Sequence, residues 1–200
     1  MNTARRFLFL LSSSRRLGNS EQLAYCAAHP LPGYTEQKWL HLSDYPLPDF
    51  ADLRHSVAYQ PPSGNAQILL EATLAATDIV LVAPLYWYNL PVSAKLYLDH
   101  WSAWLLTPGL QFREQMHGKT LWAIIVGNGE AAEAQPLAAI LSLTAQHLHM
   151  EWGGLLYGRG SRPNDIQDDA LALQQAKTFF VPPRLVETAA ISATMLASSN

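Results

Sequence analysis

Three short and nearly uninterrupted apolar segments constrain what this chain can fold into. They are Phe7–Leu11, Ile79–Ala83 and Leu121–Val126, each five or six residues long and rich in bulky or β-branched side chains. None of them alternates apolar with polar residues, as a strand with one face in water would. Strands in a parallel sheet have unbroken apolar sequences of this kind because helices cover both faces of the sheet. We therefore predict a parallel sheet between two layers of helices.

Segments with helical periodicity separate these strands. Apolar side chains recur at helical spacing over residues 94–105 and 137–148, and Pro136 suits a first helical turn. The alternation of strands and helices predicts a doubly wound α/β domain with right-handed crossovers. The remaining elements are expected to be weaker strands at Lys38–Leu42 and Glu151–Gly158 and a last helix at Asp168–Phe180.

Length and composition narrow the class of protein. Two hundred residues fit a single domain, which we expect over residues 1–186, with a tail at 187–200 that is either disordered or packed on a partner subunit. Only 14% of the residues are charged, and the net charge of −3 comes without a basic patch, so nucleic acid is not an expected partner. No apolar run is long enough to cross a membrane.

The first strand and the single cysteine bear on the compartment. Two arginines precede Phe7–Leu11, as in a signal peptide, but the brief apolar run leads into a loop and a helix, as a first strand does. Cys26 has no partner for an internal disulfide, so the cytoplasm is the expected location, and Cys26 itself is predicted to be a small packed hydrophobic residue. No metal site is expected, because His147 and His149 face different sides of a helix.

The loop after the first strand reads LSSSRRLGNSEQLA, from Leu11 to Ala24. Asn19 and Ser20 suit a helix N-cap, and Gln22 follows Asn19 at the spacing of a capping box. The helix would direct its free N–H groups into the loop, where Arg15 and the serine hydroxyls would join them in binding a phosphate. The alternative is a capped helix with a solvated polar loop. The hydroxyl donors considered are Ser12, Ser13, Ser14 and Ser20.

Two further loops belong at the same edge of the sheet. The segment PLYWYNLP, from Pro84 to Pro91, holds three consecutive aromatic residues that cannot all point into the core. A flat ligand is one explanation for them, and a dimer contact or a core plug is the alternative. In the third loop, GNGE, Gly127 and Gly129 have no side chains, so a ligand could approach the backbone closely there. A phosphate site beside an aromatic wall predicts a nucleotide-like cofactor, and one short cradle suits the monophosphate FMN.

These residues resemble the flavodoxin-like NAD(P)H-dependent reductases, which include FMN reductases, quinone reductases and azoreductases. The segment SSSRRLGNSE is similar to the phosphate loop of that family, and Asp78–Trp101 resembles its next conserved stretch. One departure is Trp87, where relatives often carry asparagine. The matching positions are Ser13, Arg15, Asn19 and Ser20 in the first segment and Pro84, Tyr86, Pro91, Lys95 and Asp99 in the second.

The resemblance implies a three-layer flavodoxin-like fold with strand order 2-1-3-4-5, bound FMN and a homodimer. NAD(P)H would reduce FMN, and a quinone-like or other flat acceptor would then take the electrons, with no catalytic acid or base from the protein. Two alternatives are an FMN-binding electron carrier, against which the modest net charge argues, and an ancillary subunit without turnover of its own. The residues implied at the ring are Leu85, Tyr86, Trp87, Tyr88, Gly127, Asn128 and Gly129.

Overall fold

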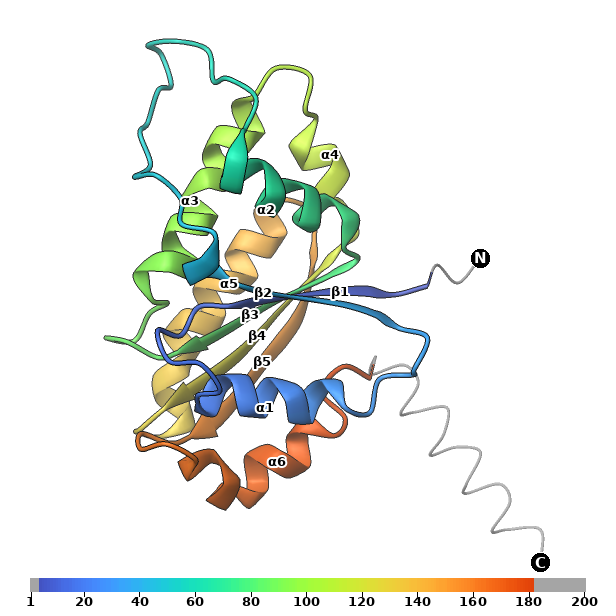
Figure 1. The fold of residues 1–200 in the computed structure, drawn as a ribbon, viewed down its shortest axis with the longest axis vertical. Coiled ribbons are helices and arrows are strands. Elements are labelled where there is room, and N and C mark those ends of the chain that lie inside the picture. The colour runs from blue at the N-terminus through green and yellow to red at the C-terminus, as the bar shows by residue number, and fades with distance from the viewer. Residues whose placement is uncertain (1–3, 182–200) are drawn as a thin grey trace, which may run out of the picture.

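The sheet has the predicted composition and strand order. A computed structural model describes residues 4–181, and its five strands are parallel in the order β2-β1-β3-β4-β5 (Figure 1). The fold class and the order 2-1-3-4-5 are thus confirmed. The strands are β1 (Arg6–Leu11), β2 (Glu36–His41), β3 (Asp78–Pro84), β4 (Thr120–Gly127) and β5 (Glu151–Arg159).

Helices cover both faces of the sheet. The helices are α1 (Asn19–Ala28), α2 (Gly64–Ala75), α3 (Val92–Leu106), α4 (Phe112–Met116), α5 (Gln135–His147) and α6 (Ala170–Ala176), with 3-10 turns η1 (Leu42–Asp44), η2 (Ala131–Ala134) and η3 (Asp165–Asp168). Helices α1 and α6 lie on one face, and α2, α3, α4 and α5 lie on the other (Figure 1). None of the helices within residues 4–181 has the length and apolar content needed to cross a membrane.

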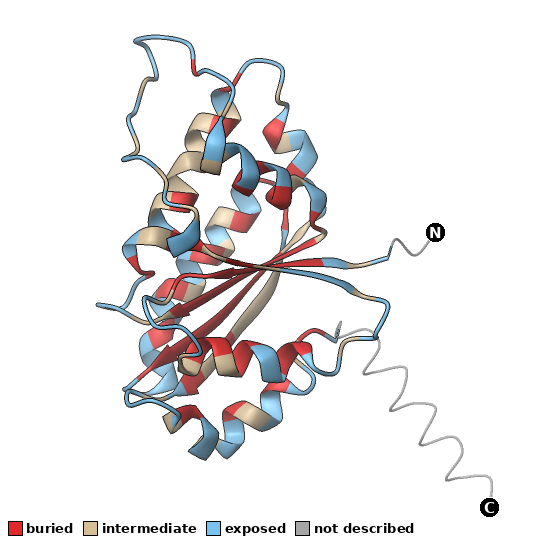
Figure 2. Cartoon of the chain, in the orientation of Figure 1, coloured by how far each residue is buried: buried red, intermediate tan, exposed pale blue. Residues whose placement is uncertain are grey.

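The core is divided in two by the sheet. In β1, Leu8 and Leu10 join the cluster under α2, α3, α4 and α5, whereas Phe7, Phe9 and Leu11 join the cluster under α1 and α6. Figure 2 shows this as buried residues along the central strands and on the inward faces of the helices. Burial on both faces explains the unbroken apolar sequences of these strands. Trp101 and Trp104 of α3 pack in the first cluster.

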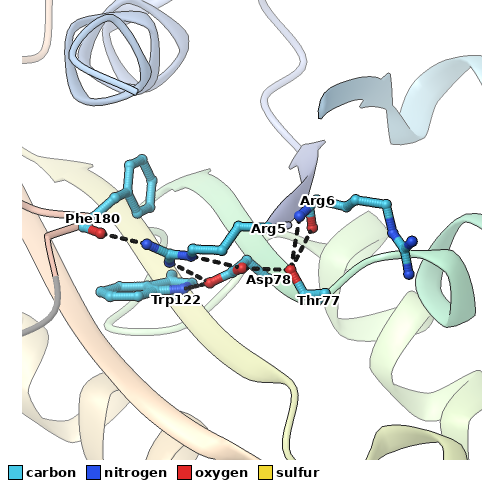
Figure 3. A network of polar contacts seen from close by, with 6 residues as sticks. All are labelled: Arg5, Arg6, Thr77, Asp78, Trp122 and Phe180. Carbon is cyan, nitrogen blue, oxygen red and sulfur yellow. Dashed lines mark hydrogen bonds and ion pairs between the residues drawn. The ribbon is translucent and has the colours of Figure 1, made fainter. Parts of the chain in front are cut away.

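A network of polar contacts lies at the edge of the sheet where its strands begin. The Arg5 guanidinium pairs with both carboxylate oxygens of Asp78, at 2.5 and 3.1 Å, and donates to the Phe180 carbonyl oxygen at 2.6 Å (Figure 3). Asp78 is buried and also accepts from the Trp122 indole at 2.9 Å and from the Thr77 hydroxyl at 2.7 Å. The carboxylate is therefore fully satisfied, as a buried charge has to be.

Two predictions were wrong in detail. Cys26 is exposed, because it lies on the outer side of α1 while Leu23, Ala24 and Ala27 face the sheet. The last helix is shorter than predicted: Asp169 caps α6 by accepting from the Ala172 N–H, and η3 comes before it. The predicted tail at 187–200 lies outside the described residues.

Candidate functional site

A cavity of about 360 Å³ lies at the carboxyl ends of the strands. Gly129 lines a neighbouring cavity of about 610 Å³, which shares Asn128 with the first. Trp87 and Tyr88 line neither cavity and stand at the tip of the turn beyond Tyr86. The other nine predicted site residues line the first cavity together: Ser13, Arg15, Asn19, Ser20, Pro84, Leu85, Tyr86, Gly127 and Asn128.

The start of α1 differs from the predicted capping box. Gly18 is the N-cap, and no side chain caps the helix there. Asn19 instead donates from Nδ2 to the Arg162 carbonyl oxygen at 2.8 Å, and Gln22 donates to the Leu17 carbonyl oxygen and to Asn164. These side chains therefore connect the loop after β1 to the loop after β5, and the first helical N–H groups are left for another acceptor.

The polar side chains of this loop have separate partners. The Ser12 hydroxyl is buried and donates to the Val82 carbonyl oxygen at 3.0 Å, so it is not available to a ligand. The Ser13 hydroxyl accepts from the Arg15 N–H at 3.1 Å. The Arg16 guanidinium pairs with Asp44, whereas the only contact of the Arg15 guanidinium within residues 4–181 is a long one, 3.3 Å, with the Ser161 carbonyl oxygen. Arg15 is thus the better placed of the two arginines to bind an anion.

The aromatic segment forms a tight two-residue hairpin. Tyr86 and Asn89 exchange backbone hydrogen bonds of 3.0 Å in both directions. Trp87 and Tyr88 at the tip have φ values of 50° and 61°, in the left-handed region. Two-residue hairpin turns with this conformation most often have the sequence Asn-Gly. The Trp87 side chain is 93% exposed, so the possibility of a core plug is excluded.

Gly127 approaches β5 closely. A Cβ atom at Gly127 would lie 2.7 Å from the Tyr157 hydroxyl oxygen, so only glycine fits without a shift. The same hydroxyl donates to the Gly129 carbonyl oxygen at 2.9 Å and so holds the turn after β4. Burial, followed by the nearby carboxylates of Glu133 and Glu130, raises the pKa of Tyr157. The hydroxyl is therefore a neutral donor at physiological pH.

The loop after β5 was missed by the sequence analysis. Gly160, Ser161 and Pro163 line the same cavity as the loop after β1. Asp165 holds this loop by accepting from the N–H groups of Ser161 and Arg162 at 2.9 and 2.7 Å, and these hydrogen bonds lower the pKa of Asp165. The sequence GRGSRP could have indicated this loop, because it stands at the end of the last predicted strand. Loops at the carboxyl ends of parallel strands meet at the edge of the sheet where ligands bind.

These features fit the phosphate and the flat ring of FMN. The N–H groups of Gly18, Asn19 and Ser20 have no acceptor within residues 4–181, and Arg15 lies beside them. Gly127, which has no side chain, and the apolar Leu85 also line this cavity. The volume of the cavity is within the range of small-ligand sites, about 300–1,000 Å³. The described residues hold no group of three or more side chains placed to bind a metal ion.

Comparison with known proteins agrees with this geometry. Residues 6–178 match a protein family that is described by its flavodoxin-like fold. The chain belongs to this flavodoxin-like family. The predicted resemblance is therefore confirmed.

Individual members of the flavodoxin-like family show how far the similarity extends. YwqN of Bacillus subtilis, whose name describes an NAD(P)H-dependent FMN-containing oxidoreductase, is 29% identical over 82% of this chain and 90% of its own length. KefF of Salmonella typhi, an ancillary protein of a glutathione-regulated potassium-efflux system, is 30% identical over 62% of this chain and 76% of its own. The solved structure of the Trp repressor binding protein of Bacillus subtilis has a TM-score of 0.69 and 24% identity, and the match covers 87% of this chain and 97% of that one.

Proposed function

We propose that this protein is an FMN-dependent NAD(P)H oxidoreductase that passes electrons to a quinone-like or other flat acceptor. One observation carries the proposal: the loops after β1, β3, β4 and β5 converge on one cavity that begins at the free N-terminus of α1. An anion site beside a flat apolar wall suits a flavin monophosphate. The name of the relative YwqN supports the same assignment.

The residues of the cavity have separate tasks in this proposal. Ser13, Arg15, Asn19 and Ser20 would hold the phosphate, with the N–H groups at the start of α1 as the main donors. When bound, FMN supplies the chemistry, since it accepts a hydride from NAD(P)H and gives up two electrons. Backbone N–H groups at Asn128 and Gly129 would stabilise negative charge at the ring edge.

The loop after β3 would define the space above the ring. Pro84, Leu85 and Tyr86 would lie against the ring, and Trp87 and Tyr88 would extend the aromatic surface toward solvent. An aromatic surface favours flat, unsaturated acceptors, because such acceptors stack on it. No protein acid or base is needed at the reacting atoms.

The absorption spectrum of the purified protein tests the proposal. The protein is reconstituted with FMN, freed of excess flavin and mixed with NADH or NADPH without oxygen. We expect the visible flavin bands to be retained and to bleach, and a quinone to restore them. Loss of all flavin during purification and reconstitution would contradict the assignment. Flavin that binds and never bleaches would favour the electron carrier or the ancillary subunit, and the similarity to KefF makes the second a specific alternative.

We also propose that the protein acts as a homodimer in the cytoplasm. The exposed apolar side chains of Trp87, Tyr88 and Val92 at the start of α3 support a second copy near the site. The single cysteine supports a reducing compartment. Sedimentation equilibrium of the FMN-loaded protein measures the oligomeric state, and a monomer at micromolar concentration would contradict the dimer.

A further inference from the structure

Glu21 is a buried carboxylate beside the proposed phosphate site. It is the third residue of α1, and only 3% of its surface is exposed. A carboxylate is seldom buried without partners that compensate for its lost hydration. A negative charge next to a phosphate site also opposes the binding of the phosphate. The position of Glu21 therefore requires a reason other than attraction to the ligand.

Two hydrogen bonds and one close histidine contact fix the carboxylate of Glu21. Its Oε2 atom accepts from the Leu17 N–H at 2.6 Å, and its Oε1 atom accepts from the Tyr25 hydroxyl at 3.1 Å. The His41 Nε2 atom lies 3.3 Å from the same Oε1 atom. His41 is the last residue of β2 and pairs with Leu11 in the sheet, while its Nδ1 atom is buried without a partner within residues 4–181. Glu21 is thus held from both the helix and the sheet.

The contact with Leu17 determines how the backbone enters the helix. Leu17 has a φ of 54°, a left-handed conformation that a leucine rarely adopts. Glu21 accepts the N–H of this residue and so stabilises the turn. The N–H groups that follow, from Gly18 to Ser20, have no protein acceptor within residues 4–181 and open onto the cavity. Without Glu21 the turn would lose the hydrogen bond that orients these donors.

We propose that Glu21 is a positioning residue for the phosphate of FMN. It does not touch the phosphate but, through Leu17, holds the donors at the start of α1 in their binding arrangement. This inference rests on the proposed function, because the anion concerned is the phosphate of FMN. It concerns the phosphate alone, so it predicts no effect on a flavin that lacks one.

A comparison of FMN with riboflavin tests this role. The flavin is removed from the wild type and from Glu21→Ala, and each protein is titrated with both ligands by flavin fluorescence. We expect Glu21→Ala to raise the dissociation constant for FMN about tenfold, the effect of one lost charge-assisted hydrogen bond, and to leave that for riboflavin unchanged. Glu71→Ala is the matched control, because Glu71 is exposed on α2 and should alter neither constant.

A second variant separates orientation from charge. Glu21→Gln keeps an oxygen acceptor for the Leu17 N–H but removes the charge, so it should bind FMN at least as tightly as the wild type. If charge alone mattered, both variants would bind FMN more tightly. If Glu21→Ala does not fold, Glu21→Met replaces it, since methionine fills a similar volume without an acceptor.

The outcomes distinguish this inference from the proposed function. A wild-type protein that binds neither flavin overturns the proposed function and this inference together. A wild-type protein that binds FMN, with an unchanged ratio of the two dissociation constants in Glu21→Ala, overturns only the role of Glu21. An equal weakening of both flavins would mean a general packing defect and would also overturn it.

Discussion

Some of the residues in left-handed backbone conformations lie in loops at the proposed site. Leu17 lies in the loop after β1, and Trp87 and Tyr88 lie in the loop after β3, with φ values of 54°, 50° and 61°. Such a conformation costs on the order of 1–3 kcal/mol for a residue other than glycine. Neighbouring hydrogen bonds hold these residues in place: the Glu21 carboxylate for Leu17, and the paired Tyr86 and Asn89 for the hairpin. Three other residues with positive φ, His55, Gln111 and His149, do not line the proposed site, so this conformation is not confined to it.

The hairpin at Trp87 and Tyr88 therefore lowers the stability of the fold while it presents an aromatic surface. Replacing both residues by the favoured turn pair, Trp87→Asn with Tyr88→Gly, should raise the free energy of unfolding by about 1–2 kcal/mol. It should also lower the rate with a planar quinone, because the stacking surface is lost. Urea denaturation and steady-state turnover measure the two effects. Trp87→Phe is the control, since it keeps the conformation and should gain no stability.

Tyr97 makes the free energy of unfolding depend on pH in the alkaline range. Complete burial in α3 raises its pKa well above 10.0, and its hydroxyl pairs with that of Thr73 at 2.6 Å. The unfolded chain loses this proton first, so stability is full below about pH 10 and falls as the pH rises beyond it. Urea midpoints measured between pH 8 and pH 11 should show this decline. A smaller decline is expected in Tyr97→Phe, and an identical decline would contradict the role of Tyr97.

At the scale of elements, neighbouring loops hold one another in place. The loop after β1 is bonded on one side to η1 through Arg16 and Asp44 and on the other to the loop after β5 through Asn19 and the Arg162 carbonyl. A Cβ atom at Gly160 would lie 2.9 Å from Asn19 Nδ2, so the two loops are in close contact. The cavity is therefore shaped by pairs of loops that contact each other.

Gly127 and Tyr157 provide a test of this coupling between β4 and β5. Gly127→Ala should weaken FMN binding by about tenfold, because its Cβ atom would displace the Tyr157 hydroxyl from a position only 2.7 Å away. Combining it with Tyr157→Phe should restore part of the loss, since the displaced atom is then absent. A double-mutant cycle of FMN titrations measures the coupling. Gly33→Ala is the control, because a Cβ atom there meets nothing within 4 Å, and strictly additive effects would contradict the coupling.

For the whole molecule, the parallel sheet between two layers of helices could be predicted from regular patterns, whereas the strand order was implied by the family resemblance. Buried parallel strands have unbroken apolar sequences, and their carboxyl ends meet at one edge. The cap of α1 did not follow: Asn19 and Gln22 suit a capping box, but their side chains bond to the distant Arg162 and Asn164. The burial of Glu21 depends on a contact with His41 in β2, and the orientation of Cys26 depends on which face of α1 packs. Contacts between remote segments leave no local pattern.

The network at the opposite edge contributes to global stability. Asp78→Asn should lower the free energy of unfolding by about 2–3 kcal/mol, less than the ~3–5 kcal/mol typical of a fully buried pair, because the Arg5 side chain is 31% exposed. FMN affinity should stay unchanged, since the cavity lies at the other ends of the strands. Urea denaturation and FMN titration measure the two quantities. Asp99→Asn breaks an exposed pair with Lys95 and should have little effect on stability.

The hydrogen bond from Arg5 to Phe180 joins residues that are 175 positions apart in the sequence, at the edge of the sheet remote from the cavity (Figure 3). The two ends of the described chain are therefore neighbours in space. A circular permutant, in which a short peptide connects these ends and new termini are opened elsewhere, would keep every strand pairing of the sheet. If the new termini are opened in another loop at this edge of the sheet, such a protein would carry a sensor domain or a surface tether away from the proposed flavin site.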